Sequence, residues 1–338
     1  MRGRDRFWAW AAGAWSLAYG ALGVWWASGG RGFPFGTGDP DGADVGSLLA
    51  GLRPGPGGAL IAALGLAGAA VAVALANGWG RGGARRALLW APLGLAGVLL
   101  LVVPDIRVLL YLGYLPAIVL RPDLGQVEWP ALNQFLVVAG GLLWFRAAVG
   151  YGRTTRTAGD PARWARIGRW ATAVAVLAPL PYAATRLAWA AGIPLGVPDS
   201  FIAMYDADSA AKGVGIFEYT LGAGALGGAI LTLGLVQRWG EVFPFWIPGL
   251  RGRRVPPMLA VVPASIVSVA LIVAGSRIFT ILPGGQELEG WGPGLPAYFW
   301  LPWGLALAVA TFAYQRRRAA TPAPGLATRQ AEVLRSTV

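Results

Sequence analysis

Eight long apolar segments constrain the fold of this 338-residue chain more than any other feature. Each is about as long as the roughly 20 residues that an α-helix needs to cross a bilayer. Gly, Pro and charged residues cluster between the segments and mark loops. The sequence therefore predicts an all-α membrane protein with eight transmembrane helices, at about Phe7–Ser28, Gly58–Asn77, Ala87–Pro104, Pro130–Val149, Ile167–Ala191, Gly213–Val236, Pro257–Arg277 and Pro296–Tyr314.

The composition excludes several functional classes. Only 13% of the residues are charged, whereas soluble domains carry about 25%. The chain has no Cys and no His, which excludes disulfides, Cys/His zinc sites, His-ligated haem and Ser–His relays. Nucleotide-binding and metalloprotease motifs are also missing, so we expect no cofactor, no metal and no catalytic residues. These observations together favour a protein that is not an enzyme.

The net charge of +12 reflects membrane orientation rather than nucleic-acid binding. Twenty of the 28 basic residues fall in the N-terminal segment, alternate loops and the C-terminal tail, regions that hold only Asp5, Asp160, Glu241 and Glu332 as acids. The positive-inside rule then predicts cytoplasmic termini. The arginine bias in a Gly- and Ala-rich chain indicates a bacterial cytoplasmic membrane, where these loops could meet anionic lipid as well as the bilayer itself.

A ninth apolar run, Ile106–Leu120, is not expected to span the membrane. A ninth span would move Arg121–Trp129 inside and reverse every later loop. We expect this run to extend the third helix and then lie in or along the outer leaflet.

The two halves of the sequence resemble each other. Tyr19-x6-Trp26-Ala27-x-Gly29 matches Tyr182-x6-Trp189-Ala190-x-Gly192, Trp79-Gly80 matches Trp239-Gly240, and Arg107 matches Arg277. Since each half has an even number of spans, both insert the same way up, which predicts parallel repeats. We expect repeats over residues 1–155 and 156–318, followed by a disordered cytoplasmic tail over 319–338.

Helix packing can be predicted at two places. Small residues four apart, Gly224 and Gly228 in one half and Gly68 and Ala72 in the other, predict that the second and sixth helices are central. Prolines at positions 179 and 181 predict a kink in the fifth helix.

Three charged residues within the outer helix ends form the candidate ligand site: Glu218, Arg186 and Arg277. Ionisable groups in a bilayer usually face a bundle interior or a cavity. The alternative is a structural salt bridge or outward snorkelling. The aligned positions in the first half are Gly58 and Gly23, so the second half is expected to be the chemically specialised one, with a preference for an anionic guest.

Other polar residues at the outer side are weaker candidates for a ligand site. Asn133 and Gln134 begin the fourth helix, where polarity at the membrane interface explains them. The acidic loop Asp39-x-Asp41-x-x-Asp44 could bind Ca²⁺, although it has no EF-hand pattern.

The segments Trp15–Gly30, Pro181–Gly196 and Phe217–Pro263 resemble uncharacterised multi-pass membrane proteins of actinobacteria. The resemblance implies a membrane location and a helical fold, and it carries no activity onto residues of this chain.

Three functions compete. The first is a transporter-like or small-ligand protein with a cavity between two repeats. The second is a non-catalytic membrane scaffold or sensor subunit that binds a protein partner. The third is a lipid-acting membrane enzyme with Glu218 as acid or base, which the missing His, Cys and carboxylate clusters make the weakest.

Overall fold

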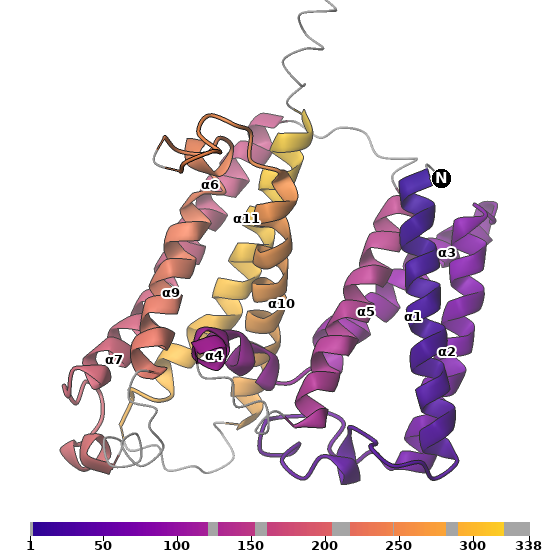
Figure 1. Cartoon of the computed structure of the whole chain (residues 1–338), viewed down its shortest axis with the longest axis horizontal. Helices are drawn as coiled ribbons and strands as arrows, with labels where there is room; N and C mark the ends of the chain where they lie inside the picture. Colours follow the sequence, from indigo (N-terminus) through magenta and orange to yellow (C-terminus); the bar gives the residue numbers. More distant parts are fainter. Residues whose placement is uncertain are drawn as a thin grey trace, which may run out of the picture.

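The computed structural model describes residues 3–120, 128–152, 161–204, 217–245, 247–281 and 290–320. This part of the chain is helical, and it contains no β-strand beyond one isolated bridge between Val242 and Arg254. The helices form two groups that stand side by side (Figure 1). The predicted all-α class is therefore correct.

The first group contains the N-terminal half of the chain. Of its four long helices, the first packs against the second and the fourth, and the third packs against the fourth. A core of buried residues that includes Trp26, Leu75 and Trp144 fills this group. Its elements are α1 (Gly3–Ala27), η1 (Gly36–Gly38), α2 (Pro54–Ala76), α3 (Gly82–Gly97), the π-helical turn η2 (Val98–Val102) and α5 (Trp129–Gly152).

The second group repeats this packing order with its own core, which includes Leu271, Trp303 and Tyr314. Its first span is broken at Ala178 and Pro179, because a proline has no N–H to continue the helix. The interruption lies at one of the two prolines for which the sequence predicts a kink. The elements are α6 (Pro161–Leu177), α7 (Leu180–Ala190), α9 (Phe217–Leu233), η5 (Arg238–Gly240), α10 (Pro257–Ile281), η7 (Leu295–Phe299) and α11 (Trp300–Ala320).

Six helical segments in the described residues are long and apolar enough to cross a membrane. They are Pro54–Ala76, Gly82–Val102, Trp129–Gly152, Ala162–Ala190, Pro257–Phe279 and Leu295–Ala319. The chain is therefore a membrane protein by the length and composition of its helices. The remaining two of the eight predicted spans correspond to α1 and the 17-residue helix α9.

The ninth apolar run forms α4 (Arg107–Leu120), which lies across the other helices and is seen almost end-on in Figure 1. It contacts α5 in the first group and α9 and α10 in the second. This orientation agrees with the expectation that the run is not a ninth parallel span.

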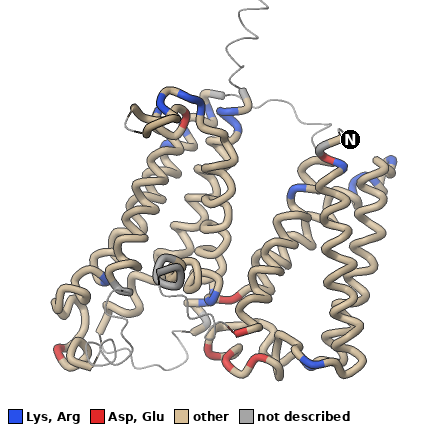
Figure 2. The backbone as a smooth tube through the Cα atoms, in the orientation of Figure 1, with Lys and Arg blue, Asp and Glu red and all other residues tan. Residues whose placement is uncertain are grey.

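The two groups meet through a small apolar cluster of Leu100, Val108, Val138 and Ala270. These residues come from η2, α4, α5 and α10, so α4 is a bridge between the two larger cores. Charged residues mark the two ends of the molecule: most basic positions lie at the end that carries the N-terminus and most acidic ones at the opposite end (Figure 2).

The prediction that α2 and α9 are central is wrong. α2 packs mainly on α1, and α9 packs mainly on α7, with smaller contacts to α6 and α4. A Cβ added at Gly224 would meet no atom within 4 Å, and one at Gly228 would touch only Trp303 at 3.8 Å. Gly68 does allow close packing, since its Cβ would lie 2.8 Å from the Ser16 hydroxyl.

Candidate functional site

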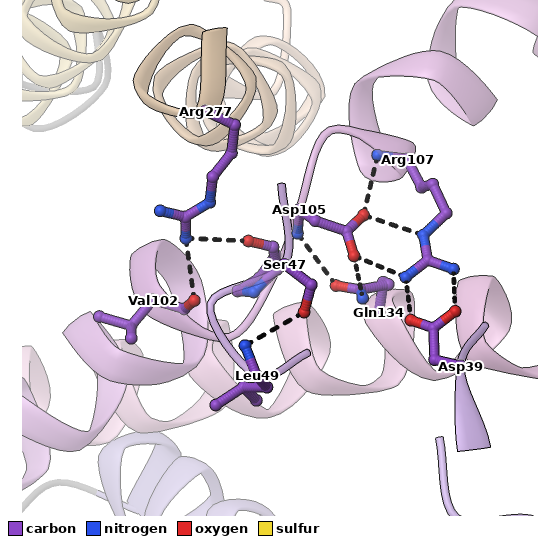
Figure 3. Close-up of polar contacts among 9 residues, drawn as sticks. Asp39, Ser47, Leu49, Val102, Asp105, Arg107, Gln134 and Arg277 are labelled. Atoms are coloured by element: carbon purple, nitrogen blue, oxygen red, sulfur yellow. Dashed lines mark hydrogen bonds and ion pairs between the residues drawn. The ribbon is translucent and has the colours of Figure 1, made fainter. Parts of the chain in front are cut away.

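A buried network of four polar side chains lies in the acidic end of the first half (Figure 3). The Arg107 guanidinium donates to both carboxylate oxygens of Asp39, at 2.9 and 2.5 Å. It also donates to both oxygens of Asp105, from Nε at 3.0 Å and from Nη2 at 2.7 Å. One arginine thus holds two carboxylates from segments far apart in the chain, in the paired geometry that guanidinium favours.

The local chain positions Asp105 for this role. The third span ends at Val102, two residues before Pro104. Asp105 Oδ1 then accepts the backbone N–H of Arg107 at 3.0 Å, which caps the start of α4. Gln134 of α5 completes the set: its amide donates to Asp105 Oδ2 at 2.8 Å and accepts the Asp105 backbone N–H at 3.2 Å. The carboxylate is therefore fixed by two different elements, α4 and α5.

These charges are almost fully removed from solvent. Asp105 is 0% exposed, Asp39 4% and Arg107 7%. Burial alone would lower the pKa of Arg107, but its hydrogen bonds to Asp105 and Asp39, together with their negative charges, outweigh burial and raise that pKa. Removing one partner from such a set would leave the others buried and uncompensated.

Arg277 connects this region to the second half. It lies in α10, is 6% exposed and donates from Nη2 to the carbonyl oxygens of Leu101, Val102 and Pro104, at 3.1, 2.9 and 3.2 Å (Figure 3). Carbonyl groups at a helix C-terminus have no partner within the helix and carry partial negative charge. Arg277 therefore caps a helix of the other half, and Asp105 also attracts it electrostatically. We call Asp39, Asp105, Arg107, Gln134 and Arg277 the ionic joint.

The cluster predicted from the sequence consists of Glu218, Arg186 and Arg277. Arg277 lies in the ionic joint, against the first half. Arg186 lies in α7 between the rings of Tyr182 and Trp189, with centroid distances of 4.9 and 4.8 Å. The side chain of Glu218 lies outside the described residues, although its backbone lies in the first turn of α9. The pairing of Glu218 with either arginine stays a prediction.

Two interpretations of outer polar residues are corrected. Asp39 does not belong to a calcium site, because both of its oxygens bind Arg107 and the described residues contain no group of three metal-ligating side chains. Asn133 and Gln134 are 0% and 1% exposed, so interface polarity does not explain them. Asn133 Oδ1 accepts the hydroxyl of Tyr19 at 2.7 Å inside the helix bundle.

Sequence reasoning missed the ionic joint because it treated Asp39 and Asp105 only as outer-loop acids. A usable signal was present: Asp105 and Arg107 stand directly between the third span and an apolar run. The joint also corrects the view that the second half alone is chemically specialised, because four of its five members belong to the first half.

Comparisons with protein-family models, curated proteins and solved structures give no match to the chain. What the joint can do therefore follows from its own hydrogen bonds and charges. Each carboxylate oxygen of Asp39 and Asp105 accepts at least one hydrogen bond from Arg107, so neither group is poised as a general base or nucleophile. The arrangement instead holds two helix groups together at one end.

Proposed function

We propose that this chain crosses the bacterial cytoplasmic membrane eight times, with α1 and α9 as the additional spans and with both termini cytoplasmic. The arginine-rich end of Figure 2 would be the cytoplasmic end. The 25 residues of α1 are enough to span a bilayer. The 17 of α9 are at the lower limit of that length.

We further propose that the halves are parallel repeats. The buried faces of their fourth helices support this. Nine buried positions recur at a constant offset of 163 residues between α5 and the continuous helical segment of η7 and α11. They are 133, 134, 137, 140, 141, 144, 147, 148 and 151 in the first half, and 296, 297, 300, 303, 304, 307, 310, 311 and 314 in the second.

Two further correspondences support the repeat. The Tyr151 hydroxyl donates to the Trp79 carbonyl at 2.7 Å, and the Tyr314 hydroxyl donates to the Gly240 carbonyl at 2.8 Å, within the matched Trp-Gly motifs. The matched glycines after α1 and α7, Gly29 and Gly192, both adopt a left-handed backbone, with φ of 92° and 73°. The same turn thus follows the first span in each half.

As function, we propose a transporter-like protein that binds a small ligand between the repeats. The observation that carries this is the separation of the cores: each half is internally packed, and a small apolar cluster and the ionic joint connect them. Parallel repeats with separate cores can rock against each other about such a connection, which is how many transporters alternate access.

For the ligand, we retain Glu218 and Arg186 of the second half as the candidate pair. With Arg277 placed in the ionic joint, one arginine stands against one acid, so the charge of the pair no longer favours an anionic guest. The first half provides a geometric reason for the pairing. A Cβ on Gly23 would lie 2.8 Å from the Gly58 carbonyl oxygen. Arg186 and Glu218 align with these two glycines, so the repeat would bring them to facing positions.

The register of this alignment has independent support one turn away. A Cβ on Gly20 would lie 3.6 Å from the Ala62 carbonyl oxygen, in the contact between α1 and α2. The aligned residues of the second half behave alike: a Cβ on Gly222 would lie 3.5 Å from the Ala183 carbonyl oxygen.

The absence of cysteine makes rocking directly testable by spin labelling. Labels on Gly83→Cys and Arg254→Cys would report the distance between the basic ends of the two halves in liposomes. A transporter-like protein should give two distance populations, whereas the control pair Arg6→Cys with Gly83→Cys, inside one half, should give one. A single narrow distance for both pairs would contradict the proposal.

The second candidate is a non-catalytic scaffold or sensor subunit, and one observation favours it. The loop between α9 and α10 presents Phe245 with 77% of its surface exposed, beside several arginines. An exposed ring beside arginines at the cytoplasmic end could serve as a contact point for a protein partner. The spin-label test separates the two candidates, because a scaffold needs no relative motion of the halves.

A further inference from the structure

A pocket of about 670 Å³ opens at the arginine-rich end of the second half, in the segment that joins α9 to α10. Its lining residues include three aromatic ones, Trp239, Phe243 and Phe245, and two arginines, Arg238 and Arg251. Aromatic rings beside arginines at the end of membrane helices are typical of the interface between hydrocarbon and lipid headgroups.

The backbone around the pocket is well braced. The Phe243 N–H donates to the Arg253 carbonyl at 3.0 Å, and the Gly252 N–H donates back to Phe243 at 3.1 Å, which makes a short hairpin. Arg318 of α11 donates to the Val255 carbonyl at 2.6 Å and ties the hairpin to the helix bundle. The pocket is therefore a preformed feature held by the last helix.

The charge of the pocket favours an anion. Arg238 and Arg251 are both exposed, and no carboxylate is among the described residues that line the pocket. The acid of the hairpin, Glu241, instead faces Arg317 and Arg318 at 3.9 Å. Arginine binds phosphate oxygens in pairs, so two such groups around one pocket suit a phosphate ester.

The exposed ring shows where the rest of such a ligand would lie. Phe245 projects from the hairpin with 77% of its surface exposed, directly beside the two arginines of the pocket. An apolar ring exposed at the membrane surface gains free energy by contacting acyl chains, while the guanidinium groups stay at the headgroup level.

We propose that this pocket is a binding site for one anionic phospholipid of the cytoplasmic leaflet. Arg238 and Arg251 hold its phosphate, and Trp239, Phe243 and Phe245 contact its glycerol and upper acyl chains. The inference rests on the proposed orientation of the membrane spans, but not on the ligand between the repeats.

Native mass spectrometry of the full chain in detergent can test the site with phosphatidylglycerol as the probe. We expect one tightly retained lipid, with phosphatidylcholine bound much more weakly. Each arginine near an anionic lipid is worth about a factor of five in affinity, so the double variant Arg238→Gln/Arg251→Gln should raise Kd about thirtyfold. The matched control is Arg253→Gln, an exposed arginine of the same hairpin outside the pocket lining.

Three outcomes would overturn the proposal: equal retention of the two lipids by the wild-type chain, unchanged Kd in the double variant, or an equal loss in the control. Inorganic phosphate that displaces the lipid at millimolar concentration would show a simple anion site instead. Phe245→Ser should weaken phosphatidylglycerol without altering binding of inorganic phosphate. Because the assay needs neither rocking nor a bilayer orientation, its failure is distinct from failure of the transporter-like function.

Discussion

At the residue scale, the ionic joint shows how a buried charge is tolerated near a membrane. Asp39 and Asp105 share one guanidinium, and each charged group has hydrogen-bond partners that replace its lost water. Buried ion pairs often add little net stability, yet removing one member is costly because the rest stay buried. The joint therefore predicts a large difference between two neighbouring aspartates.

Asp39→Asn should lower the free energy of unfolding by about 1–3 kcal/mol, since it removes a charged acceptor from the Arg107 pair. The matched control is Asp41→Asn, two residues away and exposed, which should change stability by less than about 0.5 kcal/mol. Thermal unfolding of the detergent-solubilised protein measures both. Equal effects of the two substitutions would show that the Asp39–Arg107 pair contributes nothing specific.

Glu218 provides a second prediction at this scale. If it faces Arg186, then Glu218→Ala leaves an uncompensated charge, which typically costs about 3–5 kcal/mol. The folded yield should fall well below that of Glu241→Ala, whose ion pairs at 3.9 Å are partly exposed and so worth little. Glu218→Gln should keep the yield and lose ligand binding if the carboxylate itself serves a site, since the substitution preserves shape and removes charge. Equal yields for both alanine variants would exclude the buried pair.

At the element scale, the close contact between α1 and α2 depends on glycine. A Cβ on Gly58 would lie 2.6 Å from the Gly23 carbonyl oxygen, whereas one on Gly55, in the same helix, would meet nothing within 4 Å. Gly58→Ala should therefore destabilise the protein by about 1–3 kcal/mol through overpacking. Gly55→Ala should be neutral or slightly stabilising, because alanine favours the helix. Similar melting temperatures for the two variants would contradict this close approach.

The elements also show what the sequence could and could not predict. Apolar runs and prolines locate helices well, because span length and the missing N–H of Pro179 act locally. The central placement expected for α9 failed because small residues such as Gly224 permit close packing without requiring it. The cap that Arg277 places on the π-helical turn Val98–Val102 could not be predicted, since it joins segments more than 170 residues apart.

At the scale of the whole molecule, the proposed orientation rests on where the basic residues lie, and the cysteine-free chain allows a direct test. A membrane-impermeant maleimide applied to intact cells should label Asp41→Cys and Asp199→Cys. It should not label Gly83→Cys or Arg163→Cys until the cells are opened. The reason is that arginine-rich loops remain cytoplasmic. Labelling of Arg163→Cys in intact cells would show that the topology is the inverse of the one proposed.

The ionic joint makes a further prediction about how the halves are held together. Arg277 donates from one nitrogen to three carbonyl oxygens of the other half, so Arg277→Gln removes a charged cap without enlarging the side chain. Each half keeps its own core, so the loss should fall on the connection between the halves rather than on the folding of either group.

Spin labels at Asp41→Cys and Asp199→Cys should show a broader distance distribution in Arg277→Gln than in the unsubstituted chain. The pair Arg6→Cys with Gly83→Cys, inside the first half, should be unchanged. Arg277→Lys retains the charge but not the planar donor group, and should give an intermediate width. If Arg277→Gln leaves the distribution between the halves unaltered, then α4 and the apolar cluster around Val108 hold the halves together without the arginine.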